Sequence, residues 1–359
     1  MILSALFGGG FFTLLFLDLP VLSIVVLVVL YFVYRAPKSP DASFFNDILI
    51  GHRGCRYIKT RNIPENSLSA VRYSIEHGSD GVELDCQLTK DGEIMVFHDT
   101  LSMGRVCYGL GSYQEKINMG MGKFTVDEIK KNFRYRDDDS GKEEIPTLEE
   151  YIQFVFSLDT KQVIMIEVKQ YTRLALMAKK LNELFHKYPQ LLTQSTVASF
   201  NPVLLYVVRQ HNPKIVTNLL FKKGLFTDWM KYCTPKSDSK TGPGLKKVHS
   251  KDFPEILQDV TENCDNNLKD RLVFNTLSTL TSVIDNVWYY ANITVIPSFI
   301  GAAVLGFDDS LAHDLDYLKN LQKRGYVTNV WVVNDIELKK KLLSNVKLAL
   351  TTDFLFPIE

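Results

Sequence analysis

The chain lacks an excess of charge of either sign, because its 359 residues hold 41 Lys plus Arg and 41 Asp plus Glu. Without a net positive charge no long-range field attracts nucleic acid, so we predict no nucleic-acid partner. A CxxC spacing is also missing among the five cysteines, which argues against a zinc site and a disulfide framework and favours reduced thiols. No feature indicates an obligate protein partner. Any recognition of anions is therefore expected at a local site.

Basic residues are absent before the N-terminal apolar stretch. Residues 5–34 are almost wholly apolar apart from Asp18 and Pro20, and Arg35 follows directly. A signal peptide has its positive charges in front, so we predict a membrane anchor over residues 1–35. The positive flank predicts that the rest of the chain is cytoplasmic. Asp18 leaves open whether the stretch spans the bilayer or re-enters, and a core helix is the alternative.

A repeating pattern follows a linker over residues 36–47. Short β-branched runs alternate with helical stretches over residues 48–356, and insertions occupy about 100–145 and 222–292. Alternating strands and helices are typical of an α/β fold with a parallel sheet, and eight strands predict a closed (β/α)8 barrel, or TIM barrel. The predicted strands are Ile48–His52, Gly81–Asp85, Val163–Lys169, Thr196–Phe200, Ile215–Phe221, Ile293–Ser298, Val327–Asn334 and Leu348–Asp353.

One segment interrupts this alternation. Only seven residues separate Asp85 from Glu93, fewer than a parallel crossover needs, so the segment from Glu93 to His98 is predicted to fold back as a hairpin. Asp91 and Gly92 are a strong two-residue turn signal. If they occupy the turn, His98 lies opposite Asp85 on the same face.

Carboxylates stand two residues apart in the second predicted strand, and a further one lies in the third. Glu83 faces the same way as Asp85, and Glu167 faces the same way as Lys169, because alternate residues of a strand share a face. Buried carboxylates at neighbouring strand ends need a cation between them. Oxygen ligands favour Mg²⁺ or Ca²⁺, and zinc is disfavoured because no closed Cys/His set is present.

Further polar motifs stand near these carboxylates in the predicted barrel. They are His52 with Arg53, Glu65 with Asn66, and His98. Each has an ordinary structural alternative: Arg53 could simply pair with Glu65, and a single histidine is more often a core residue than a catalyst. Together, at the carboxyl ends of barrel strands, they provide what a metal-assisted attack on a phosphodiester requires.

The series of motifs resembles the glycerophosphodiester phosphodiesterase family of the PLC-like phosphodiesterase barrels, over about residues 48–356. It is also similar to the membrane-anchored eukaryotic branch of that family, some of whose members act on lysophospholipids. The matching residues are His52–Gly54, Pro64–Asn66, Glu83, Asp85, Thr89–Gly92, His98, Asp99, Glu167–Lys169, Ser199, Phe200, Trp331, Asn334, Thr352 and Asp353.

The resemblance implies a role for each group. Glu83, Asp85 and Glu167 would hold the divalent ion, while His52 and His98 would form the general acid/base pair. The remaining roles are phosphate binding by Arg53 and Lys169, a pocket wall formed by Trp331, and ordering of the first loop by Glu65 and Asn66. The chain departs from the family at Cys55 and Val332, and in the spacing that leads to Arg105.

Two substrates fit these expectations, a water-soluble glycerophosphodiester and a lysophospholipid. Hydrolysis would release an alcohol head group together with glycerol phosphate or lysophosphatidic acid. The alternative from another functional class is a catalytically inactive, membrane-tethered barrel that acts as a scaffold or binds lipid. The sequence argues against it, because no histidine or carboxylate of the set is missing.

Overall fold

A closed ring of eight parallel strands organises the computed structural model, which describes residues 20–355 apart from 56–61, 139, 159–160, 226 and 228–267. The first strand pairs with both the second and the last, and these pairings close the ring. The predicted (β/α)8 barrel is therefore confirmed. In their order around the ring the strands are β1 (Ile48–Gly51), β11 (Leu348–Thr352), β10 (Val327–Trp331), β9 (Val304–Asp308), β8 (Thr217–Phe221), β7 (Ser195–Ser199), β6 (Val163–Val168) and β2 (Gly81–Leu88).

One of the eight predicted strands is wrong. The run Ile293–Ser298 is helical, because it contains the end of α11 and most of α12. The strand of this βα unit is instead β9, Val304–Asp308, which sequence reasoning missed. Short apolar runs do not distinguish a buried strand from a buried helix by periodicity. The other seven predicted strands overlap those observed.

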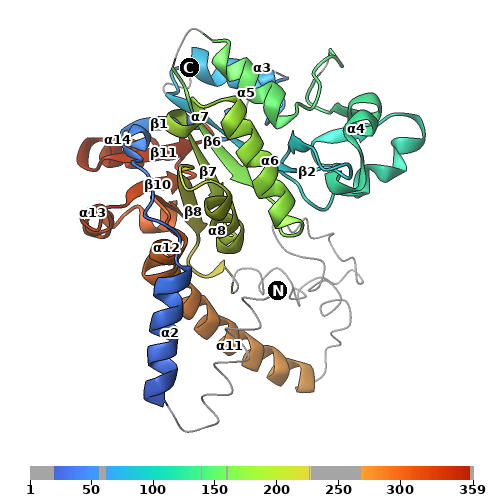
Figure 1. Ribbon diagram of the computed structural model, residues 1–359. Coiled ribbons are helices and arrows are strands. Elements are labelled where there is room, and N and C mark those ends of the chain that lie inside the picture. The colour runs from blue at the N-terminus through green and yellow to red at the C-terminus, as the bar shows by residue number, and fades with distance from the viewer. Residues whose placement is uncertain are drawn as a thin grey trace.

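Helices cover the outside of the ring (Figure 1). Several begin at side-chain caps that the sequence provides: Thr147 and Glu150 form a capping box before α5, and Asn201 caps α8 with Pro202 in its first turn. The helices of the barrel are α3 (Leu68–Glu76), α5 (Leu148–Phe156), α6 (Leu174–Lys187), α7 (Leu191–Gln194), α8 (Pro202–His211), α11 (Leu268–Ile293), α12 (Val295–Ile300), α13 (Leu315–Lys323) and α14 (Ile336–Asn345).

The core has two layers that follow strand alternation. The larger layer packs outward-facing strand residues such as Ile166 and Phe307 against the helices. A smaller layer, with Ile50, Met165 and Leu220, fills the inside of the barrel. The interior is thus a packed core, and the chemistry of a barrel is built at the carboxyl ends of its strands.

The predicted hairpin exists, but its register is wrong by one residue. β3 (Ile94–Val96) pairs antiparallel with β2, and Cys86 lies opposite Val96. Phe97, not His98, is therefore the residue opposite Asp85, and its amide donates to the Asp85 carbonyl. The cause is the turn, which contains three residues and ends with Gly92 at a φ of 88°.

The first insertion forms a small layer of its own at the side of the barrel (Figure 1). It holds a two-stranded antiparallel sheet and a helix around a separate apolar cluster that includes Phe97, Met103 and Phe133. These elements are β4 (Cys107–Gly109), α4 (Val126–Asn132) and β5 (Phe133–Tyr135). The second insertion lies largely outside the described residues, which resume at α11.

The predicted membrane anchor is not supported. The first described helix, α2 (Pro20–Tyr34), has 15 residues, fewer than the roughly 20 that a span needs. Across the described ranges, no helix combines the length and apolar character required to cross a bilayer. α2 projects from the barrel beside α12 (Figure 1), where the Tyr31 hydroxyl donates to Ser298 Oγ at 3.0 Å.

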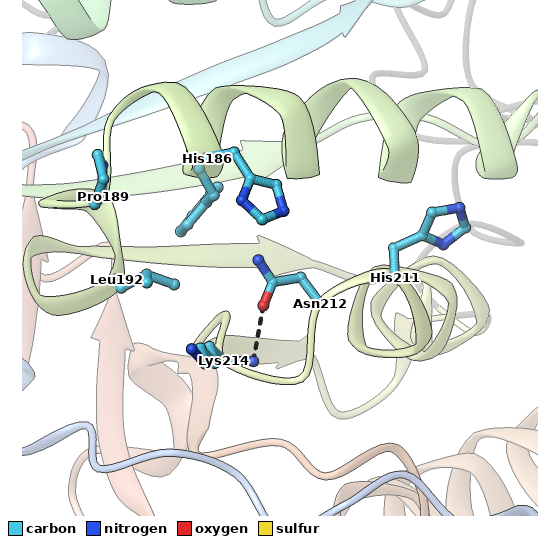
Figure 2. A pocket seen from close by; sticks show the side chains of 7 residues that line it. His186, Pro189, Leu192, His211, Asn212 and Lys214 are labelled. Carbon is cyan, nitrogen blue, oxygen red and sulfur yellow. Dashed lines mark hydrogen bonds between the residues drawn. The ribbon is translucent and has the colours of Figure 1, made fainter.

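A pocket of about 250 Å³ opens between α6, α7 and α8. Figure 2 shows His186 and Asn212 pointing into it, with the Asn212 side chain accepting from the Lys214 amide at 3.0 Å. Its lining residues precede β7 and β8 in the chain, so it opens at the amino-terminal ends of these strands. Barrel chemistry is built at the opposite ends, and we exclude this pocket from the candidate site.

Candidate active site

Three carboxylates meet at the carboxyl ends of two neighbouring strands. Glu83 and Asp85 point inward from β2, and Glu167 is the register partner of Asp85 on β6. One oxygen from each residue lies within 4.8 Å of the others. All three side chains are buried. The predicted group of carboxylates is therefore brought together.

The oxygens of this cluster are suited to a metal ion. Within the described chain, Glu83 Oε1 and Asp85 Oδ1 are buried and accept no hydrogen bond. Burial, together with the charges of Asp85 and Glu167, raises the pKa of Glu83 well above its usual value. A divalent cation would remove this repulsion, and carboxylate oxygens are the ligands that Mg²⁺ and Ca²⁺ prefer. The cluster thus fits the predicted metal.

Arg53 reaches the cluster from the turn that follows β1. Its backbone amide donates to Glu83 Oε2 at 2.8 Å, and its guanidinium lies 3.1 Å from Asp85 Oδ2 and 3.0 Å from Glu65 Oε1. Gly54, with a φ of 69°, allows this turn to pack on α3, since a Cβ there would lie 2.7 Å from the backbone of Ala70. The ion pair between Arg53 and Glu65 that the sequence analysis considered is therefore present, and Arg53 also contacts Asp85.

Asn66 and Lys169 hold the other side of Asp85. The Asn66 amide donates to Asp85 Oδ2 at 2.9 Å and its oxygen accepts from the Asp85 amide at 3.1 Å. Lys169 Nζ pairs with Glu167 and lies 3.4 Å from Asp85 Oδ1. Burial alone favours a raised pKa for Asp85, but the charges of Arg53, His98 and Lys169 outweigh it and hold the pKa below its usual range.

His52 is oriented by the last strand of the barrel. Its Nδ1 lies 2.6 Å from Asp353 Oδ1, which leaves Nε2 facing Glu83 at 3.9 Å. Asn334 fixes the carboxylate by donating to Asp353 Oδ2 at 2.8 Å. Burial, then the nearby Arg53 charge, lowers the pKa of His52 to about 4, with Asp353 acting in the opposite direction. The ring is therefore neutral at physiological pH.

His98 has a matching partner in the adjacent residue. Its Nδ1 lies 2.7 Å from Asp99 Oδ1, and Asp99 in turn accepts from Arg105 Nε at 2.6 Å. Arg105 also donates to both oxygens of Glu65. Burial lowers the pKa of His98, against the opposing charge of Asp85. A carboxylate therefore holds Nδ1 in both histidines, so Nε2 is the nitrogen that could exchange a proton.

Trp331 lies at the opposite side of the opening, where β10 ends. Its ring meets Phe200 edge to face, with ring centroids 5.4 Å apart, and Lys169 Nζ is 5.8 Å from the centre of Phe200. The predicted site residues thus lie in one connected group of contacts, and Trp331 joins it through Phe200, which lies beside Lys169. Sequence reasoning gave no role to Asp353, Asp99 or Arg105, although the motifs included the first two.

The sequence matches the model of the glycerophosphoryl diester phosphodiesterase family over residues 52–237. The chain belongs to this family. Human glycerophosphodiester phosphodiesterase 1 is 27% identical over 314 residues, which are 85% of this chain and 77% of the human protein. Glycerophosphodiester phosphodiesterase from Caldanaerobacter subterraneus is 32% identical over 186 residues, which are 51% of this chain and 70% of that protein.

A solved structure supports the fold of this family member. The phosphodiesterase from Oleispira antarctica in complex with the product sn-glycerol-3-phosphate superposes with a TM-score of 0.56 at 18% identity, covering 89% of this chain and 94% of that one. The phosphodiesterase class predicted from the sequence is confirmed at the level of the family.

Proposed function

We propose that this protein hydrolyses glycerophosphodiesters to glycerol phosphate and an alcohol, with a bound divalent cation. The observation that carries the proposal is the buried cluster of Glu83, Asp85 and Glu167, whose oxygens lie within 4.8 Å of one another, flanked by His52 and His98. Family membership and the names of the relatives support the same activity.

The cation would be held by Glu83, Asp85 and Glu167, and it is Mg²⁺ or Ca²⁺. When bound, it would neutralise charge on the phosphate oxygens as a Lewis acid. The two carboxylate oxygens without hydrogen bonds support this assignment. Arg53 and Lys169 border the same carboxylates, and they would bind the remaining phosphate oxygens.

The two histidines would carry the protons. One removes the proton from a hydroxyl of the substrate's own glycerol, which attacks phosphorus, and the other protonates the departing alcohol. The roles then reverse as water opens the resulting cyclic phosphate. A neutral ring held at Nδ1 by a carboxylate is suited to accepting a proton at Nε2, and the ring that protonates the departing alcohol would carry a proton on Nε2, as the imidazolium, when the anionic substrate is bound.

The remaining predicted residues would position these groups. Glu65 fixes Arg53, and Asn66 fixes Asp85 through two hydrogen bonds. Trp331 would pack against the carbon skeleton of the glycerol. A silent scaffold would not need the histidines and the carboxylates together, so their joint presence favours the enzyme over this alternative.

Release of choline from glycerophosphocholine tests the proposal. We expect hydrolysis that is lost with a chelator and restored by Mg²⁺ or Ca²⁺. His52→Ala and His98→Ala should each lower kcat by at least about 100-fold, while His186→Ala, outside the site, should retain the wild-type rate. Full activity of both site variants would contradict the proposal. A parallel assay with lysophosphatidylcholine measures the second predicted substrate.

A further inference from the structure

Gln87 is a buried polar residue beside the site that has no part in the roles described above. It stands two positions after Asp85 on β2. Its neighbours Cys86 and Leu88 pack in the outer apolar layer, so by strand alternation Gln87 faces the same way as Asp85. Only 4% of the residue is exposed. Burial of an amide opposes folding unless hydrogen bonds compensate it, so the partners of Gln87 indicate what it contributes.

The side-chain amide of Gln87 holds the backbone on both sides of His98. Its Nε2 donates to the Phe97 carbonyl at 3.0 Å and to the Asp99 carbonyl at 3.1 Å. An amide nitrogen has two N–H groups, and each can serve one of these oxygens. Because both partners are carbonyls, which only accept, the nitrogen of the amide must be the atom that faces them. Gln87 therefore fixes the two peptide groups that flank His98.

An interruption of the ladder between β2 and β3 explains why a side chain is needed here. The Phe97 amide donates to the Asp85 carbonyl at 2.8 Å. In a regular antiparallel pair the Asp85 amide would return a bond to the Phe97 carbonyl. It donates instead to Asn66 Oδ1, at 3.1 Å. The Phe97 carbonyl is thus released from the ladder, and Gln87 provides its donor.

The bonds from Gln87 differ from the carboxylate contact that holds the histidine ring. Asp99 Oδ1 lies 2.7 Å from His98 Nδ1, but these two residues are adjacent in the chain and can move together. Gln87 instead ties their backbone to β2, the strand that carries two of the three carboxylates. A group that transfers a proton must be held to within about 0.5 Å of its productive position. The bonds from Gln87 are suited to providing that restraint.

We propose that Gln87 is a positioning residue, which fixes the place of His98 relative to the carboxylate cluster and so sets the rate at which His98 transfers its proton. The inference rests on the proposed function, in which His98 exchanges a proton with the substrate. Gln87 itself takes no proton, and its Nε2 is occupied by two protein carbonyls, so it acts through His98. Its loss should lower kcat and leave KM nearly unchanged.

A double-mutant cycle with His98 tests this role. Gln87→Met keeps the length of the side chain and removes both donors, and we expect it to lower kcat on glycerophosphocholine by about 10- to 100-fold. In His98→Ala the group to be positioned is gone, so adding Gln87→Met should lower the remaining kcat by less than about twofold. A residue that only supported the fold, or that acted on the metal, would lower kcat equally in both backgrounds.

Gln322 provides a matched control. Its Nε2 also donates to two oxygens, Thr328 Oγ1 and the Lys347 carbonyl. It lies in the last turn of α13, near the amino-terminal ends of β10 and β11 and away from the site, so Gln322→Met should keep the wild-type kcat. Thermal unfolding identifies a variant that fails to fold. Gln87→Glu, which has the same size but no donor when ionised, then takes the place of Gln87→Met in the cycle.

A crystal structure of Gln87→Met gives a readout that does not depend on activity. We expect the backbone of residues 97–99 to move away from β2, and His98 to shift or to adopt more than one orientation. The inference is overturned if Gln87→Met keeps the wild-type kcat, if its loss persists in His98→Ala, or if His98 keeps its place in the crystal. If the wild type hydrolyses no diester with Mg²⁺ or Ca²⁺, the proposed function is contradicted, while the crystal structure still decides whether Gln87 holds His98.

Discussion

Each histidine of the site is fixed by a carboxylate that is itself fixed by another side chain. Asp353 holds His52 and accepts from Asn334, whereas Asp99 holds His98 and accepts from Arg105. The donor to Asp353 is the neutral amide of Asn334, whereas the donor to Asp99 is the charged guanidinium of Arg105. The two rings therefore differ in the charge that surrounds them, although they are held in the same way.

Asp353→Asn should preserve the shape of the site while removing the carboxylate that accepts from His52 Nδ1. The ring can then adopt the wrong tautomer, and we expect kcat to fall by about 10²- to 10⁴-fold with little change in the unfolding midpoint. Steady-state kinetics and thermal unfolding measure both quantities. Asp335→Asn, at a helix cap that asparagine also satisfies, is the control. A change confined to KM would contradict the positioning role.

The lowered pKa of His52 makes stability depend on pH. Its pKa is about 4 in the folded protein against 6.5 ordinarily, so below pH 6.5 the unfolded chain binds a proton that the folded chain does not. Stability is therefore lost as the pH falls from 6.5 towards 4. With a chelator present, the free energy of unfolding of the wild type should fall by about 2 kcal/mol more than that of His52→Gln between pH 7 and pH 5. Urea unfolding tests this, and parallel profiles would contradict it.

At the scale of elements, sequence patterns predicted the closed barrel and seven of its eight strands, but not the position of β9 or the register of the hairpin. The run Ile293–Ser298 is rich in β-branched residues yet forms helix, because position in the fold outweighed local preference. The register of the hairpin depended on whether its turn holds two residues or three. Contacts such as Arg105 with Glu65, 40 positions apart, leave no periodic signal in the sequence.

The first insertion contributes to the site through Arg105. This side chain joins Glu65 to Asp99, so Arg105→Met would leave Glu65 paired with Arg53 alone and free Asp99 to move. We expect kcat to fall at least about tenfold, with measurable destabilisation. Arg134→Met is the matched control, because Arg134 lies in β5 of the same insertion and donates to the backbone carbonyls of Lys130 and Phe133. Equal losses in both variants would contradict a specific role.

For the whole molecule, the carboxylate cluster would make stability depend on metal binding. Repulsion among Glu83, Asp85 and Glu167 opposes folding at neutral pH, and a bound cation removes it. At 100 times its Kd, Mg²⁺ or Ca²⁺ should stabilise the fold by about 2.7 kcal/mol, raising the unfolding midpoint by a few degrees. Glu167→Gln should reduce this shift, and Glu183→Gln, at an exposed helix position, should not. An unchanged midpoint in wild type would contradict metal binding.

Closure of the ring has a consequence for when the protein becomes active. His52 follows the first strand and Asp353 follows the last, so 301 positions separate two atoms that lie 2.6 Å apart. During synthesis the carboxylates of β2 and β6 leave the ribosome well before Asp353, the partner of His52, which follows β11. A nascent chain that stops before β11 would therefore carry the three carboxylates without the group that orients His52, and hydrolysis would begin only after β11 and Asp353 have joined the barrel.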